Sequence, residues 1–386
     1  MSVLTPRIAA ELAEFVYQFK NASSTGISNF ASTSLIEKNF DFNLSNGPVQ
    51  GVSGGFFSHL FNRSTGFAVM GQGKSPQYKG QHIIAIRGTE FTSGRDWLTN
   101  FHIGLSGSAN GSAAHAGFNK AFNSMRPAFQ NYLDKNPGGT LHCIGHSLGG
   151  ALATLTANWA KSEYGREVKL YTFGAPRVGM EGFSIKTNAS IEKIYRCTHG
   201  ADPVPSVPLW PFTHAGTEYQ LSSGSGMSID AHSMTGNSPG YINTAGKCDD
   251  FSKLQTISAR NISQTVRLQY ENRYQAFFSP HWSERISAAL ITLLKDSGYY
   301  AAVAAQATMT VGLTFYDMLA RTLTEVAQAS AKFAGQATGL LGHMLVFAGK
   351  ASVKITELTY EFIRWVFSIT VNALYRIARQ AIDSIN

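Results

Sequence analysis

The stretch that decides the fold runs Thr140-Leu-His-Cys-Ile-Gly-His-Ser147-Leu-Gly-Gly-Ala151. Its centre, from Gly145 to Gly149, fits the pattern G-x-S-x-G. The apolar residues before it predict a buried strand, and the Ala- and Leu-rich residues after it predict a helix. A strand-to-helix turn this sharp strains the serine backbone and lifts the hydroxyl above the end of the sheet. The pattern therefore predicts that Ser147 is a nucleophile rather than an inert residue in a structural turn.

Strands and helices alternate on both sides of this stretch. Helices are expected at 5–19 and 118–133, and strands at 67–71, 82–86, 100–105, 169–173, 191–198 and 216–221. Such alternation predicts a mainly parallel central sheet in an α/β protein. From about Asp249 the pattern changes to helices. We therefore expect an α/β domain over 1–248, a connecting helical segment over 249–298 and an apolar helical region over 299–386.

The composition narrows the choice of partner. The 386 residues carry a formal net charge of +8, with 44% hydrophobic and 15% charged residues. This charge suits an anionic surface such as a phospholipid membrane, and an ordinary basic surface is the plain alternative. Nucleic acid is not expected, because the chain has no basic stripe with interleaved aromatics. Neither a metal nor another cofactor is expected, because no cluster of His, Cys and Asp has ligand spacing.

The first twenty residues, Met1 to Lys20, do not read as a signal peptide. They lack a basic start, a continuous apolar core and a small-residue cleavage site. Thr5 followed by Pro6 is instead typical of a helix start. We therefore expect a protein made in the cytoplasm that stays there, associates with a membrane, or is secreted by a non-Sec route.

A serine nucleophile needs a base and a carboxylate that orients the base. Asp202 follows an apolar strand, and no other Asp lies between Ser147 and the last predicted strand. His232 comes a short loop after that strand, which favours it as the base. His281, at the start of a later helix, is the main alternative. Two further histidines, His199 and His214, lie near Asp202 in the sequence but do not follow the last strand.

Six short runs occur in a characteristic order. They are Ile84-Ala-Ile-Arg-Gly-Thr89, Asp96-Trp-Leu-Thr-Asn100, His115-Ala-Gly-Phe118, Gly145-His-Ser-Leu-Gly-Gly150, Phe173-Gly-Ala-Pro-Arg-Val-Gly179 and Asp202-Pro-Val-Pro205. With this set of motifs the chain resembles the class 3 (fungal-type) lipases, and more closely their bacterial members, over about residues 5–240. The resemblance implies an α/β-hydrolase fold with Ser147 as nucleophile, Asp202 as acid and a histidine after the last strand as base.

The resemblance also implies an oxyanion hole. Thr89 would supply one donor, and the backbone N–H of Leu148 would supply the second, in agreement with the expected helix start. The segment from Phe91 to Trp97 matches the position of the family's lid. Two features depart from the family: the short gap between Asp202 and His232, and the helical C-terminal extension.

The helical region 299–386 holds seven basic and five acidic side chains, few for a solvated bundle. Its longest uncharged run is marginal for a membrane span. Three arrangements are open: a helical domain packed on the hydrolase, helices lying in a membrane interface, or true spans. Four basic residues could attract anionic lipid, namely Lys350, Lys354, Arg376 and Arg379.

Together these patterns predict a serine esterase that hydrolyses lipid esters, as a phospholipase A or a triacylglycerol lipase. Phospholipid is preferred because of the basic charge and the extension. The expected export route suggests a lipase effector directed against bacteria or a host, with an immunity or secretion protein as partner. The alternatives are an acyl-transferase or thioesterase with the same triad, and a scaffold that binds a membrane or partner and has a decayed site.

Overall fold

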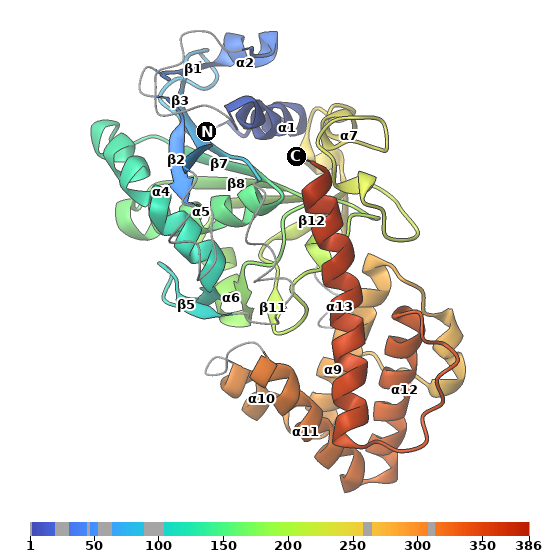
Figure 1. The fold of residues 1–386 in the computed structure, drawn as a ribbon. Coiled ribbons are helices and arrows are strands. Elements are labelled where there is room, and N and C mark those ends of the chain that lie inside the picture. Colours follow the sequence, from blue (N-terminus) through green and yellow to red (C-terminus); the bar gives the residue numbers. More distant parts are fainter. Residues whose placement is uncertain are drawn as a thin grey trace.

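The computed structural model describes residues 2–19, 31–44, 47–52, 64–88, 104–257, 265–307 and 313–385. Within these ranges a nine-stranded sheet crosses the centre of the molecule in the order β1-β3-β4-β7-β8-β10-β12-β13, with β2 paired to β3 (Figure 1). The strands are β1 (Phe40–Phe42), β2 (Val49–Val52), β3 (Ser64–Gly73), β4 (His82–Ile86), β7 (Leu141–His146), β8 (Val168–Phe173), β10 (Lys193–His199), β12 (Thr217–Ser222) and β13 (Gln255–Ile257).

The middle of this sheet is parallel. The four pairs β4–β7, β7–β8, β8–β10 and β10–β12 are parallel, whereas β1, β2, β3 and β13 are antiparallel to their neighbours. Every residue of β4, β7 and β8 is buried. Continuous apolar strands of this kind require cover on both faces of the sheet. The predicted α/β fold class is confirmed.

Helices cover both faces. One face packs against α4 (Ala116–Lys135), α5 (Leu148–Tyr164) and α6 (Glu181–Ser190), and the other packs against α1 (Pro6–Phe15) and α7 (Tyr241–Ala245). Alternate residues of the strands divide between the two cores: Ile84 faces α4 and α5, whereas Ile83 faces α1. The predicted start of α1 is confirmed, since Thr5 Oγ1 accepts a hydrogen bond from Ile8 N at 3.2 Å. Smaller elements are α2 (Ser34–Asn39), η1 (Val16–Phe19), η3 (Val204–Ser206), η4 (Asp230–His232) and η5 (Phe251–Lys253).

A second, four-stranded sheet lies beside the first. It has the order β11-β9-β6-β5, formed by β5 (Leu105–Gly107), β6 (Ala113–His115), β9 (Gly179–Met180) and β11 (Phe212–Thr213). The strand expected at 100–105 meets β5 only at Leu105, and residues 100–103 lie outside the described part of the chain.

The C-terminal extension is a helical unit packed on the hydrolase. It comprises η6 (Tyr270–Gln275), α9 (Pro280–Asp296), α10 (Tyr300–Ala307), α11 (Leu313–Ala329), α12 (Ala331–Phe347) and α13 (Tyr360–Ser384). Its apolar core is continuous with Val204, Val207 and Trp210, which follow β10. Long α13 runs from the far end of the extension back to α7 and touches η3 and η4 on the way (Figure 1). In the described ranges, no helix combines the length and apolar character that a membrane crossing needs.

A buried arginine joins the extension to the hydrolase. Arg177 is 1% exposed and donates to the carbonyl oxygens of Ser206 and Pro208 at 3.0 and 2.7 Å. Its guanidinium also pairs with Glu284 of α9. Arg177 belongs to the Phe173–Gly179 motif of the α/β part of the chain. Its positive charge is therefore neutralised by Glu284, a residue of the extension. The division of the chain into an α/β domain (1–248), a connecting segment (249–298) and a helical region (299–386) remains a prediction.

The crossing of β7 and α5 leaves no room for side chains at two glycines. A Cβ added at Gly145 would lie 2.2 Å from the carbonyl oxygen of Gly149, and one at Gly149 would lie 2.2 Å from that of Ile86. Both contacts are with backbone atoms, which cannot rotate away. The two glycines of the motif are therefore required by packing as well as by the turn.

We predict that Gly149→Ala lowers the free energy of unfolding by about 3 kcal/mol or more, the upper end of overpacking costs, because backbone must move. Urea denaturation followed by circular dichroism measures the change. The matched control is Gly335→Ala on the exposed side of α12, where a Cβ meets nothing within 4 Å. This control should gain about 0.5–1 kcal/mol. Equal stability of the Gly149→Ala and wild-type chains would contradict the packing argument.

Candidate active site

Ser147 occupies a strained turn between β7 and α5. Its backbone has φ 55° and ψ −131°, and among the described residues it alone combines a positive φ with a side chain. Such a conformation costs on the order of 1–3 kcal/mol and persists only where the surroundings enforce it. Here the Ser147 N–H donates to the carbonyl of Phe173 at 2.8 Å, which ties the turn to the end of β8. The strand, strained serine and helix expected from the motif are all present.

The structure brings Ser147, His232 and Asp202 together. Nε2 of His232 lies 2.8 Å from Oγ of Ser147, and Nδ1 lies 2.9 and 3.1 Å from the two carboxylate oxygens of Asp202. A carboxylate accepts only, so Nδ1 carries a proton, and Nε2 faces the serine hydroxyl. The three residues are at most 1% exposed. The arrangement can therefore withdraw a proton from the serine hydroxyl at a buried site.

Two further donors hold the Asp202 carboxylate. The backbone N–H of Val204 donates to Oδ1 at 2.9 Å, and the hydroxyl of Tyr241 donates to Oδ2 at 2.7 Å. The Tyr241 oxygen in turn accepts from the N–H of His199 at 3.0 Å. Tyr241 lies in short helix α7, and no sequence motif marks it. Its role depends on packing that only the folded chain reveals.

The other candidate histidines lie elsewhere. The ring of His199 stacks on Tyr241 with centroids 3.8 Å apart, and its Nδ1 donates to the carbonyl of Ala231 at 2.7 Å. Burial lowers the pKa of His199, in keeping with a neutral ring that fastens the loop before His232. Nε2 of His214 bonds the carbonyl of Pro205 at 2.7 Å. His281 is exposed in the first turn of α9 and touches Trp282.

A second buried network, which the sequence did not suggest, lies behind the serine. His146 bonds the carbonyl of His232 through Nε2 at 2.8 Å and the hydroxyl of Tyr17 through Nδ1 at 2.7 Å. A carbonyl only accepts, so Nε2 carries the proton and Nδ1 accepts from Tyr17. Burial is the main cause that holds the pKa of His146 well below its usual range, which agrees with this neutral form. Tyr17 thereby connects the N-terminal helices to the loop that carries His232.

Of the residues predicted for an oxyanion hole, only Leu148 is described, and the predicted lid is not described. Thr89 and the segment from Phe91 to Trp97 lie outside the described residues. The chain leading to Thr89 passes close to the serine, since a Cβ on Gly88 would lie 3.0 Å from Cβ of Ser147. The Gly88 N–H donates to Tyr17 Oη at 3.1 Å. Leu148 is the first residue of α5, where backbone N–H groups lack partners within the helix.

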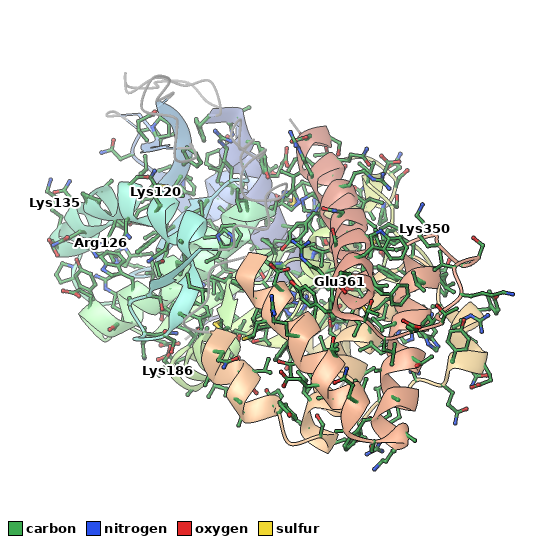
Figure 2. The ribbon with its side chains drawn as sticks, turned by 60° about the horizontal axis from the view of Figure 1, so that its bottom comes forward. Lys120, Arg126, Lys135, Lys186, Lys350 and Glu361 are labelled. Carbon is green, nitrogen blue, oxygen red and sulfur yellow. The ribbon has the colours of Figure 1, made fainter. Side chains whose placement is uncertain are left out.

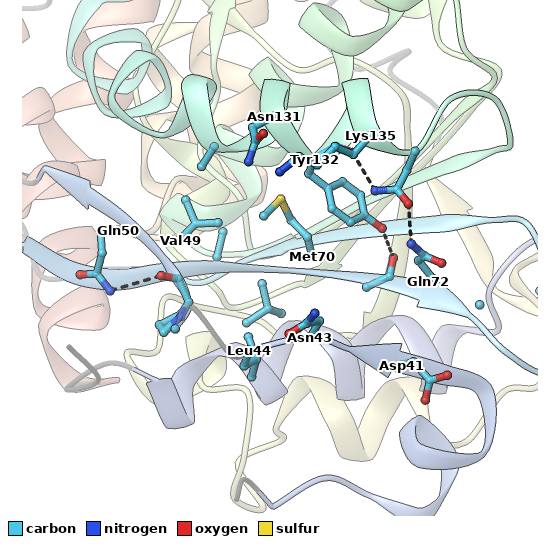
Figure 3. Close-up of a pocket in the computed structure, with 18 residues that line it drawn as sticks. Asp41, Asn43, Leu44, Val49, Gln50, Met70, Gln72, Asn131, Tyr132 and Lys135 are labelled. Carbon is cyan, nitrogen blue, oxygen red and sulfur yellow. Dashed lines mark hydrogen bonds between the residues drawn. The ribbon is translucent and has the colours of Figure 1, made fainter. Parts of the chain in front are cut away.

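A separate hollow of about 700 Å³ lies between β3 and α4 (Figure 3). Met70, Gln72 and Tyr132 line it, and the Tyr132 hydroxyl donates to the carbonyl of Gly71 at 2.7 Å. The described residues Ser147, Leu148, Asp202 and His232 do not line this hollow.

Glu14 of α1 is a titratable group close to the network behind the serine. Burial raises the pKa of its carboxyl from 4.5 to about 7. The neutral form is therefore favoured in the folded chain. As the pH rises from 4.5 to 7, the unfolded chain loses this proton before the folded chain does, so the stability contributed by Glu14 falls.

We predict that Glu14→Gln leaves the thermal midpoint unchanged near pH 4.5 and raises it at pH 8. The gain at pH 8 should be on the order of 2 kcal/mol, because the variant never buries a charge at this position. Differential scanning calorimetry over this pH range measures it. Glu271→Gln, at an exposed position, serves as the control and should show no pH-dependent gain. A parallel pH dependence for the Glu14→Gln and wild-type chains would refute the argument.

Ser147 follows β7, Asp202 follows β10 and His232 follows β12, which is the chain order of serine, acid and histidine in an α/β-hydrolase. Comparison with known proteins points to one family. Residues 83–212 match the family model described as Lipase (class 3). The resemblance seen in the motifs is thereby confirmed.

Two fungal relatives show the extent of the similarity. The chain is 34% identical over 150 residues to "Secreted mono- and diacylglycerol lipase 1" of Fusarium solani, covering 37% of this chain and 44% of that protein. It is 32% identical over 149 residues to "Secreted mono- and diacylglycerol lipase A" of Penicillium cyclopium, covering 36% of this chain and 48% of the relative. The chain thus spans about half the length of these curated relatives, at 44% and 48%.

Solved lipase structures also overlap the chain in part. The Lip2 lipase of Yarrowia lipolytica is 23% identical and covers 56% of this chain and 77% of its own, with a TM-score of 0.40. A triacylglycerol lipase of Penicillium expansum is 20% identical and covers 60% of this chain and 84% of its own, with a TM-score of 0.37.

These relatives correct the expected localisation. Several are named as secreted lipases, which conflicts with a protein that stays in the cytoplasm, associates with a membrane there, or leaves by a non-Sec route. The expectation relied on the residues from Met1 to Lys20. The structure shows that 6–15 form helix α1, whose apolar side is buried in the core, so the composition of this segment reflects packing. The effector role and the immunity or secretion partner rested on the same expectation and lose their basis with it.

Proposed function

We propose that this chain is a serine esterase that hydrolyses carboxylic esters of lipids. The observation that carries the proposal is the continuous hydrogen-bond chain from Ser147 through His232 to Asp202, at a strained turn in a buried site. A serine, an imidazole and a carboxylate in this order form the arrangement used for nucleophilic attack on esters. The match of residues 83–212 to the class 3 lipase model supports the same chemistry.

The proposed reaction has two steps. Oγ of Ser147 attacks the ester carbonyl while Nε2 of His232 takes the hydroxyl proton, giving a tetrahedral oxyanion. The intermediate collapses, the C–O bond to the alcohol breaks, and His232 returns the proton to the departing alcohol. A water molecule, deprotonated by His232, then attacks the acyl-enzyme and releases the fatty acid. Asp202 stabilises the imidazolium that forms in each step.

The oxyanion would be held by two donors. The backbone N–H of Leu148 sits at the positive end of α5, next to the serine, which supports it as one donor. We assign Thr89 as the second from its place in the Arg-Gly-Thr motif and from the closeness of Gly88 to Ser147.

The proposed substrates are glycerolipid esters presented at a lipid surface. Relatives are named as mono- and diacylglycerol lipases, which supports a glycerolipid substrate here. The net charge of +8 favours an anionic surface, and so phospholipid over neutral triacylglycerol. On this reading the protein works as a phospholipase A at a membrane surface. A panel of defined lipids with product identification by mass spectrometry tests this choice against a triacylglycerol lipase.

We predict that Ser147→Ala lowers the turnover of a soluble short-chain ester by at least about 10³-fold, because the hydroxyl that forms the acyl-enzyme is lost. The fold should persist, because alanine removes only the hydroxyl. A serine-reactive fluorophosphonate should label the wild-type chain and not the variant. A folded Ser147→Ala chain with near wild-type turnover would overturn the mechanism.

We predict that His232→Ala inactivates the enzyme and that His281→Ala does not. Of these two histidines, His232 has a ring nitrogen within hydrogen-bond distance of Ser147, whereas His281 is exposed on α9. Turnover of the same soluble ester measures both variants, and circular dichroism checks that each is folded. Loss of activity in the His281→Ala chain alone would assign the base to the extension.

A further inference from the structure

A basic pocket lies between α13 and the residues that follow α12. It has a volume of about 530 Å³, and the residues with polar groups that line it are Lys350, Asn372, Tyr375, Arg376 and Arg379. Asn372, Arg376 and Arg379 share one face of α13 at helical spacing, and Lys350 reaches them from a distant point of the sequence. The sequence had suggested a group of four cations, and the structure gathers three of them, without Lys354, around one hollow.

The charge of this pocket is not compensated from within. Among the described residues that line it there are three cations and no carboxylate. Arg379 shares an ion pair of 3.4 Å with Asp383, which lies outside the lining. In the described part of the chain neither Lys350 nor Arg376 has an ion-pair partner, and both are exposed. Like charges that converge repel each other, and an anion bound between them would relieve this repulsion.

We propose that this pocket binds the phosphate of an anionic lipid headgroup and so holds the protein on a lipid surface. Two guanidinium groups and an ammonium match a phosphate, because arginine offers paired N–H donors and lysine a point charge. The amide of Asn372 adds a further donor or acceptor at the rim. The proposal rests on the proposed function, in which the substrate is a lipid.

A lipid source is favoured over free phosphate by the rest of α13. Trp365 is 39% exposed and precedes Ile369, Asn372 and Arg376 along the same side of the helix. Tryptophan and arginine on one face are typical of helices that lie at a membrane interface. The same helix touches η4, which ends at His232. A headgroup bound in the pocket would therefore hold the lipid surface against α13, which packs beside the loop that carries His232.

The test uses the full chain carrying Ser147→Ala, so that vesicle lipids are not hydrolysed. Sedimentation compares phosphatidylcholine vesicles with vesicles that also contain phosphatidylglycerol. The pocket variant is Lys350→Gln with Arg376→Gln. The matched control is Lys120→Gln with Arg126→Gln on α4, which removes the same charge from a surface away from Lys350 (Figure 2).

We expect the unchanged pocket to favour the anionic vesicles, and the pocket variant to weaken that binding by about 10-fold or more, since each cation near an anionic surface contributes about 1 kcal/mol. The control should stay within about threefold. An equal loss of vesicle binding in both variants would mean that the overall positive charge attracts the lipid, and would overturn the proposal. A wild-type pocket that does not favour anionic vesicles would overturn it too. A separate experiment measures the binding of inorganic phosphate by calorimetry. If the pocket variant loses phosphate binding but keeps its vesicle binding, the pocket is a site for free phosphate instead.

Activity toward a soluble short-chain ester separates this proposal from the proposed function. With Ser147 intact, the pocket variant should match the wild-type turnover of such an ester, because its side chains are remote from the reacting atoms. A chain that binds anionic vesicles through the pocket yet hydrolyses no ester would sink the proposed function and leave the lipid site standing.

Discussion

The close crossing of β7 and α5 is the constraint on which the rest of the site depends. Backbone atoms of Gly145, Gly149 and Ile86 approach so closely that no Cβ fits between them. The crossing forces Ser147 into its positive φ and points the start of α5 at the space above the sheet. The strained backbone at Ser147 is maintained because β4, β7 and β8 are buried along their whole length and hold the turn from both sides.

Neutral rings and a tyrosine hydroxyl fix the groups around His232 from several directions. His199 holds the carbonyl of Ala231, His146 holds that of His232 itself, and Tyr241 holds Asp202. Burial lowers the pKa of both His146 and His199, so each presents one N–H and one acceptor in a fixed tautomer. The candidate base therefore sits in a loop that is fastened by side chains from β7, β10 and α7.

Chain order in the sequence predicted which candidate residues would meet, and the structure brings the three of them together. Ser147, Asp202 and His232 were predictable in this way, since each follows a strand and the order of strands fixes which end of the sheet they share. Tyr17, His146 and Tyr241 were not predictable, because their partners are far away in sequence and no spacing announces them. The localisation predicted from the N-terminal segment is contradicted by the relatives that are named as secreted. The composition of this segment is that of a packed helix, α1.

The shared core between the hydrolase and the extension limits how the chain can be shortened. Val204, Val207 and Trp210 are buried against helices of the extension, and Arg177 finds its carboxylate partner on α9. A chain cut after residue 248 would expose this apolar surface beside Asp202 and leave a buried cation unpaired. A shortened version of this protein would thus need a redesigned surface where the two parts meet, with polar residues in place of the apolar ones and a new partner for Arg177.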